Sequence, residues 1–187
     1  MAVILDISIS LDGYVAAPND RPGEELGDGG QRLHDWALAS ASELDREVLD
    51  ATWGRAGAVI SGARTFDVCL ERWGGRPPWD GPWFVLSHEN PRRVALGGSA
   101  FRFVDGVESA LARAHAVADR QDVVVMGGAG TARAFLNAGL VDELQLDVAP
   151  VLLGGGVRLF DGVDAAELQP ARVIGTLAAT HLRYRLR

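Results

Sequence analysis

Strands and helices alternate along most of the chain in the pattern of hydrophobic and polar positions. Short apolar runs rich in Val and Ile are typical of strands that are covered on both faces. Such runs predict strands at residues 2–11, 57–61, 83–87 and 122–126. Apolar residues at helical spacing predict helices at residues 42–51, 107–120 and 132–138, with Ser42 as an N-cap and Gly139 as a C-cap.

The C-terminal part of the chain loses the helical spacing. Residues 144–151, 172–178 and 182–187 have strand patterns, and the last two are predicted to form a hairpin. Strands that alternate with helices early and follow one another later indicate an α/β fold. We expect a mostly parallel central sheet flanked by helices, with an antiparallel C-terminal edge, in one domain over residues 1–187.

A loop interrupts the first part of this pattern. Residues 18–31 contain two prolines and four glycines with almost no apolar side chain. Such a stretch forms no regular element, and it is long enough to act as a lid.

Composition narrows the chemistry. All eighteen basic residues are arginine, which excludes a Schiff-base lysine, a P-loop lysine and a Ser-Lys dyad. The net charge of -7 argues against nucleic acid and anionic membrane surfaces as partners. One cysteine allows no internal disulfide, and no stretch reaches the roughly 18 apolar residues of a membrane span. We therefore expect a cytoplasmic protein, and the absence of His-rich ligand spacing argues against a metal site.

A glycine turn joins the strongest predicted strand to a helix. The strand at residues 122–126 runs directly into Gly127, Gly128, Ala129, Gly130 and Thr131. Backbone N–H groups at such a helix N-terminus favour a phosphate, and the Thr131 hydroxyl adds a donor. The spacing differs from the G-x-G-x-x-G of a Rossmann turn, and a tight turn without a ligand remains the alternative.

Two other predicted strands also end in groups that suit an anion. These groups are Gly62, Arg64, Thr65, Ser87 and His88. The planar guanidinium of Arg64 suits phosphate, and Thr65 can present its hydroxyl. Three such strand ends fit a dinucleotide that lies across the edge of an open α/β sheet.

Several segments resemble one protein family. They are residues 10–16 (SLDGYVA), 62–66, 127–128, 138–144 (AGLVDEL) and 150–160 (PVLLGGGVRLF). Over residues 4–187 the chain is similar to the C-terminal reductase domain of the bacterial riboflavin-biosynthesis deaminase-reductase, which shares the dihydrofolate reductase fold. The resemblance implies about eight strands in the central sheet, NADPH as hydride donor and a homodimer.

The resemblance also implies which residues would bind NADPH. The nicotinamide end would lie at Val15 and Ala16, phosphate at Gly62, Arg64 and Thr65, the adenosine 2′-phosphate at Ser87 and His88, and the pyrophosphate at residues 127–131. These assignments agree with the three anion sites inferred from the residues alone.

Three residues are candidates for the substrate side. Asp12, in the turn after the first strand, is the candidate catalytic group; alternatively, its carboxylate accepts backbone N–H bonds in an Asp-Gly turn. Trp36 could stack on a planar ring, or it could anchor its loop to the core. Ser8 is assigned to the substrate with Trp36. His181, in a terminal strand, is expected at the surface or as a hydrogen-bonded core residue.

The expected activity is NADPH-dependent reduction of a small planar heterocycle, resembling the 5-amino-6-(5-phosphoribosylamino)uracil reductase of riboflavin biosynthesis. Members of that family typically have glutamate where this chain has Met126 and lysine where it has Tyr14. Two alternatives stay open, a dihydrofolate reductase-type activity and a non-catalytic protein that binds or senses NADPH.

Overall fold

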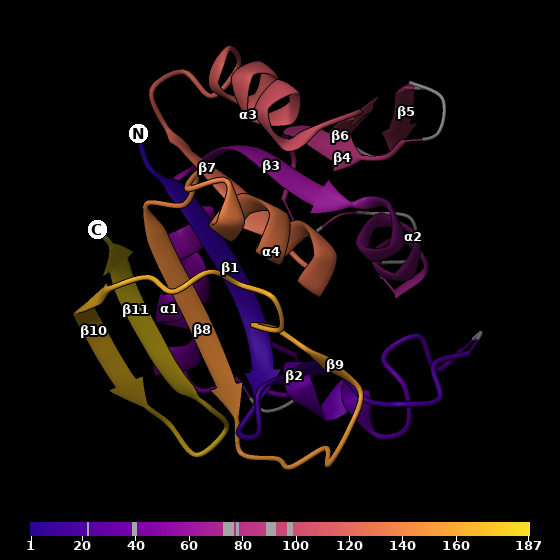
Figure 1. The fold of residues 1–187 in the computed structure, drawn as a ribbon, viewed down its shortest axis with the longest axis vertical. Coiled ribbons are helices and arrows are strands. Elements are labelled where there is room, and N and C mark those ends of the chain that lie inside the picture. Colours follow the sequence, from indigo (N-terminus) through magenta and orange to yellow (C-terminus); the bar gives the residue numbers. More distant parts are fainter. Residues whose placement is uncertain (22, 39–40, 73–76, 78, 89–92, 97–98) are drawn as a thin grey trace.

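A nine-stranded sheet forms the centre of the computed structural model, which describes residues 1–187 apart from 22, 39–40, 73–76, 78, 89–92 and 97–98 (Figure 1). Its strands are β1 (Val3–Ser10), β3 (Ala56–Gly62), β4 (Pro82–Leu86), β5 (Arg93–Leu96), β6 (Ser99–Val104), β7 (Asp122–Met126), β8 (Glu143–Ala149), β10 (Leu168–Gly175) and β11 (Thr180–Leu186). Their order across the sheet is β10-β11-β8-β1-β7-β3-β4-β6-β5. The strands from β8 to β6 run parallel, whereas β5, β10 and β11 pair in the antiparallel sense.

The remaining elements surround this sheet. The strands β2 (Tyr14–Ala16) and β9 (Val157–Arg158) pair with each other in a small second sheet. The helices are η1 (Gly30–His34, a 3-10 helix), α1 (Glu43–Trp53), α2 (Ala63–Arg72), α3 (Val107–His115) and α4 (Ala129–Asn137).

The predicted fold class and the order of the main elements are confirmed. The strand β7 has the predicted bounds, and β10 and β11 form the predicted hairpin. The helix predicted at 107–120 ends at His115, and further on Asp119 and Arg120 adopt positive φ values of 46° and 65°, which a right-handed helix does not allow. The pattern did not predict β5 and β6 of the central sheet, nor β2 and β9 of the small sheet. The nine strands of the central sheet agree with the resemblance, which implies about eight.

Each face of the sheet packs against its own helices. On one face, Leu5 and Ile7 of β1 share a hydrophobic cluster with Ala110 of α3 and Phe135 of α4. On the other face, Val124 of β7 belongs to a cluster that contains Phe66 of α2 and, at its edge, Trp53 of α1. Figure 1 shows α4 in front of β1 and α1 behind β8 and β11. Burial on both faces explains why the central strands are continuous apolar runs.

Two predicted caps hold the ends of helices. The Ser42 hydroxyl accepts from the Asp45 N–H at 3.2 Å, and the Asp45 carboxylate accepts from the Ser42 N–H at 2.7 Å, which is a capping box at the start of α1. At the end of α4, Gly139 has a φ of 64°, and its N–H and that of Leu140 donate to the carbonyls of Leu136 and Phe135. This is a Schellman motif, in which the left-handed residue favours glycine.

The chain leaves β1 and β7 in opposite directions. From β1 it passes through α1 to β3, on the far side of β7, and from β7 it passes through α4 to β8, on the far side of β1. These two helices cover opposite faces of the sheet. Ligands of open α/β sheets bind at the carboxyl ends of two strands related in this way. The topology therefore places a candidate crevice where β1 and β7 end.

Candidate functional site

Two turns that the sequence analysis assigned to anions interlock at this end of the sheet. Gly127 and Gly128, between β7 and α4, have φ values of 80° and 60°. A Cβ at Gly127 would lie 2.3 Å from Cγ2 of Thr65, at the start of α2, and a Cβ at Gly62 would lie 2.6 Å from Oγ1 of Thr131, in the first turn of α4. Each turn thus needs glycine in order to accept the threonine of the other, and the two predicted sites become one.

The first turn of α4 offers backbone donors to this joint site. Its N-cap is Gly128, so no side chain caps the helix. The first backbone bond described within the helix runs from the Ala132 N–H to the Gly128 carbonyl, which leaves the N–H groups of the preceding turn directed out of the helix end. Gly130 is exposed, and a Cβ there would meet no atom within 4 Å. Open space, N–H groups and the helix dipole together fit a phosphate group.

Arg64 adds a charge to the rim, and the loop before η1 holds it. Its guanidinium is bonded to the Asp20 carboxylate and donates to the Glu25 carbonyl at 3.2 Å. The hydrogen bond and charge of Arg64 lower the pKa of Asp20. Because 68% of the Arg64 side chain is exposed, a phosphate could still reach it. The predicted lid loop therefore reaches the start of α2 and places a carboxylate on the candidate phosphate ligand.

Ser87 and His88 follow β4, which lies next to β3 in the sheet. The Ser87 N–H donates to the Val104 carbonyl at 3.0 Å, and His88 Nδ1 lies 2.7 Å from the Asp105 carboxylate. The imidazole of His88 is 94% exposed. The third predicted anion site therefore lies at the same edge of the sheet as the other two.

Asp12 lies in the turn between β1 and β2, and its carboxylate is bonded to the backbone. It accepts from the N–H groups of Leu153 at 3.1 Å and Gly154 at 2.7 Å. A hydrogen bond with Ser10, together with these N–H groups, lowers the pKa of Asp12 to about 2. This geometry fits the turn-forming alternative, and a catalytic role for Asp12 stays a prediction. Val15 and Ala16, the predicted nicotinamide residues, follow on β2, which is paired to β9.

The two predicted substrate residues lie together. Trp36 Nε1 donates to Ser8 Oγ at 3.0 Å, and the indole is 4% exposed. Its ring meets the ring of His181 edge-on, with centroids 4.8 Å apart. A ring so covered has no free face for stacking, so the geometry favours the alternative in which Trp36 anchors its loop to the core.

His181 is the hydrogen-bonded core residue that the sequence allowed as one alternative, but sequence reasoning missed the buried polar network around it. His181 of β11 lies with Nδ1 2.7 Å from Asp147 of β8 and with Nε2 2.8 Å from Asp45 of α1. Burial acts to lower the pKa of His181, but the two carboxylates raise it. Burial acts to raise the pKa of Asp45, but hydrogen bonds from Ser42 and His181 lower this pKa to about 2. The pattern signal was the alternation of Asp6, Ser8 and Ser10 with apolar residues in β1.

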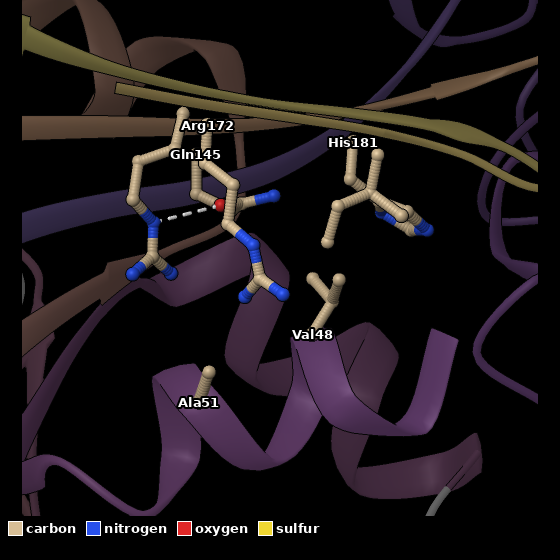
Figure 2. Close-up of a pocket in the computed structure, with 7 residues that line it drawn as sticks. Val48, Ala51, Gln145, Arg172 and His181 are labelled. Atoms are coloured by element: carbon tan, nitrogen blue, oxygen red, sulfur yellow. Dashed lines mark hydrogen bonds between the residues drawn. The ribbon is translucent and has the colours of Figure 1, made fainter. Parts of the chain in front are cut away.

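A small pocket opens between α1 and the sheet beside this network (Figure 2). Its lining residues are Val48, Ala51, Gln145, Arg172, Ile174, His181 and Arg183. Arg183 donates from Nε to the Gln145 side-chain oxygen at 3.0 Å and from its terminal nitrogen to Thr52 Oγ1 at 3.0 Å. His181 is the member of the Asp45–His181–Asp147 network that lines this pocket.

Metal-ligand clusters and membrane-spanning helices are two features that the described residues lack. Within them, no group of three or more His, Cys, Asp or Glu side chains could hold a metal ion. No helix in the same part of the chain is long and apolar enough to cross a membrane.

The fold defines the class of protein: an open, doubly wound α/β domain, in which two glycine turns interlock beside the topological switch point. The sequence matches the RibD C-terminal domain family over residues 1–180, and the chain belongs to this family.

Named relatives fit this assignment. The chain is 34% identical over 172 residues to the riboflavin biosynthesis protein RibD of Corynebacterium ammoniagenes, a match that covers 84% of this chain and 45% of the relative. It is 30% identical over 152 residues to RibD of Mycobacterium tuberculosis, a match that covers 73% of this chain and 42% of that relative. The chain thus spans less than half the length of either protein.

Solved structures share the whole fold. A putative riboflavin biosynthesis protein from Shewanella sp. PV-4 superposes with a TM-score of 0.77 at 26% identity, over 100% of this chain and 99% of that one. The deaminase/5-amino-6-(5-phosphoribosylamino)uracil reductase of Thermotoga maritima gives a TM-score of 0.63 at 16% identity, over 100% and 56%.

Alanine at Gly127 and at Gly130 should separate packing from binding. We expect Gly127→Ala to lower the free energy of unfolding by about 2 kcal/mol, because of its positive φ and the contact with Thr65. Gly130→Ala lies in helical backbone with open space, and should raise that free energy by up to about 1 kcal/mol while weakening NADPH binding. Urea unfolding and NADPH titration measure both effects. Unchanged NADPH affinity in Gly130→Ala would show that no phosphate meets this turn.

Removing the carboxylate that holds Arg64 should tighten cofactor binding. Asp20→Asn frees the guanidinium, and exposed ion pairs contribute up to about 1 kcal/mol, so we expect the Kd for NADPH to fall about two- to fivefold. Asp28→Asn is the matched control, because it breaks the Arg21 ion pair within the same loop. Equal Kd values for Asp20→Asn and the control would contradict the proposed contact.

The His181 network should give a pH-dependent stability. The pKa of His181 is raised in the folded state, so protonated His181 stabilises the fold. This contribution is complete below about pH 6.5 and is lost as the pH rises through the folded-state pKa. The lowered pKa of Asp45 stabilises the fold above about pH 4, a contribution that is lost as the pH falls toward 2.

His181→Gln should therefore cost roughly 3–5 kcal/mol at pH 6, because it leaves buried carboxylates without their partner. His88→Gln changes an exposed histidine beside a carboxylate and should cost less than about 1 kcal/mol. Urea unfolding from pH 4 to 9 measures both variants. A variant at position 181 that keeps the stability and the alkaline slope of the wild type would be inconsistent with this account.

Proposed function

We propose that this chain is an NADPH-dependent reductase of a small planar heterocycle of the pyrimidine class. The observation that carries the proposal is the interlocking of the turns at Gly62–Thr65 and Gly127–Thr131, which follow the neighbouring strands β3 and β7. Family membership supports it, as do relatives named for riboflavin biosynthesis and a structural neighbour titled as a uracil-derivative reductase.

The residues present suit a dinucleotide with an extra phosphate. The N–H groups at the start of α4 would bind the pyrophosphate, because they are directed out of a helix end without a side-chain cap. Arg64 and His88 would bind the 2′-phosphate, since both side chains carry N–H donors and both are exposed. The backbone of Val15 and Ala16 would bind the nicotinamide carboxamide.

The remaining steps of the reaction belong to the substrate side of the crevice. NADPH, when bound, supplies a hydride from its nicotinamide ring. Asp12 would hold the 150–156 segment against the end of β1 through the N–H groups of Leu153 and Gly154, and so shape the pocket. Ser8 and Trp36 would fix the opposite wall, where the indole is already immobilised. A cytoplasmic location and a homodimer stay predictions.

Cofactor titration followed by turnover tests the proposal. Purified protein is titrated with NADPH and NADH by fluorescence, and NADPH oxidation is then followed with 5-amino-6-(5-phosphoribosylamino)uracil and, separately, with dihydrofolate. We expect NADPH binding and turnover of the pyrimidine. Failure to bind either nucleotide would overturn the proposal. Turnover of dihydrofolate alone would replace its substrate, and binding without turnover would favour a sensing protein.

Arg64→Ala tests which phosphate that side chain meets. A charge-assisted hydrogen bond contributes about 1.5–3 kcal/mol, so the NADPH Kd should rise about 10- to 100-fold while the NADH Kd changes little. Arg113→Ala, on the exposed surface of α3, is the control. Equal losses for both nucleotides would assign Arg64 to the pyrophosphate instead.

A further inference from the structure

Asp6 lies in β1 at the level where the neighbouring strand β7 ends. In the register of the sheet it lies opposite Met126, the last residue of β7, and opposite Gln145 of β8. Beyond this level β1 continues through Ser8 to Ser10 with β8 alone beside it, because β7 has given way to the Gly127 turn. Asp6 is half-buried at this level.

The carboxyl group of Asp147 lies within hydrogen-bond reach of Asp6. Asp147 Oδ1 accepts from Gln145 Nε2 at 2.9 Å and lies 2.7 Å from His181 Nδ1. Asp147 Oδ2 is buried and has no hydrogen-bond partner among the N–H and O–H groups of the described residues. A proton on Asp6 supplies the missing donor. One carboxylic acid and one carboxylate satisfy the pair, whereas two ionised groups would repel each other.

The surroundings of Asp6 keep that proton in place. Burial, the negative charge of Asp147 and the hydrogen bond to it raise the pKa of Asp6 well above its usual range, while the charge of Arg183 acts in the opposite direction. Other charged groups of the packed elements are already committed. His181 bridges Asp147 and Asp45, and Arg183 is bonded to Gln145 and Thr52 and lies near Glu143.

We propose that Asp6 is the catalytic acid of the reduction. This role rests on the function proposed above. Hydride reaches the carbon of a carbon–nitrogen double bond, the π electrons move to nitrogen, and nitrogen takes the proton from the Asp6 carboxyl group. The products are a C–H bond, an N–H bond and the Asp6 carboxylate. Met126, the neighbour of Asp6 on β7, has no proton to give, and Asp12, in the turn after β1, is ionised.

A hydrogen-bonded chain connects Asp6 to the surface. From Asp147 it passes through His181 to Asp45, whose other oxygen lies 2.6 Å from the hydroxyl of the exposed Ser42. Groups that both accept and release a proton alternate along this path. The chain gives the Asp6 carboxylate a route by which it regains a proton after each turnover.

The proton on Asp6 can be observed without a substrate. Protein labelled with carbon-13 at the aspartate carboxyl carbons is titrated by NMR from pH 4 to 9. We expect one aspartate to remain protonated at pH 7, and its signal to vanish in Asp6→Asn but to persist in Asp50→Asn, a matched change on the exposed surface of α1. Asp6→Glu, which keeps a carboxyl group, provides the assignment if Asp6→Asn does not fold. Full ionisation of every aspartate at pH 7 would overturn the proposal.

Delivery of the proton is tested with NADPH and 5-amino-6-(5-phosphoribosylamino)uracil. General acid catalysis contributes roughly 10²–10⁴-fold, so Asp6→Asn should lower kcat at least about 100-fold and lose the alkaline limb of the pH profile. Its NADPH Kd should stay within about twofold of the wild type. Equal turnover by the two proteins would refute the role of Asp6 alone. Wild-type protein that does not turn over this pyrimidine would refute the proposed substrate together with the delivery step.

Discussion

The two hydrogen bonds of His181 are the interaction on which the crevice depends. They join β8, β11 and α1 at one buried point, and α1 belongs to the connection that carries the chain from β1 over to β3. Since the edge-on contact with Trp36 adds the loop before α1, this cluster fixes both α1 and that loop against the sheet. Removing charges from water is costly, so the cluster is tolerated only because each carboxylate has a donor.

The packing of the interlocked turns depends on sterics rather than charge. Parallel strands bring their carboxyl ends to one edge, and this topology unites residues that are more than sixty positions apart in sequence. Thr65 fills the space over Gly127, and Thr131 fills the space over Gly62, so neither glycine can be replaced without moving the other turn. The glycines therefore serve packing first. The same small residues leave the N–H groups at the start of α4 without a side-chain cap.

How much the sequence could predict depended on the range of the forces involved. The bounds of β7 and the cap at Gly139 follow from local pattern and backbone sterics, and both are confirmed. The bond between Arg64 and Asp20 depends on where a glycine-rich loop folds, which no local pattern encodes. The network around His181 was missed for a related reason: its carboxylates come from positions far apart in the chain, and polar residues within apolar strands indicate burial only once their partners are known.

Asp6 and Asp12 show why residue type alone is a poor guide to chemistry. Both lie on or just after the same strand, and both are aspartates near the crevice. Backbone N–H groups and a hydroxyl surround Asp12 and stabilise its anion, so it serves as an acceptor that ties down a loop. A second carboxylate and burial surround Asp6 and stabilise its neutral acid. A reduction consumes a proton as well as a hydride, and of these two aspartates only the neutral acid can give one up at neutral pH.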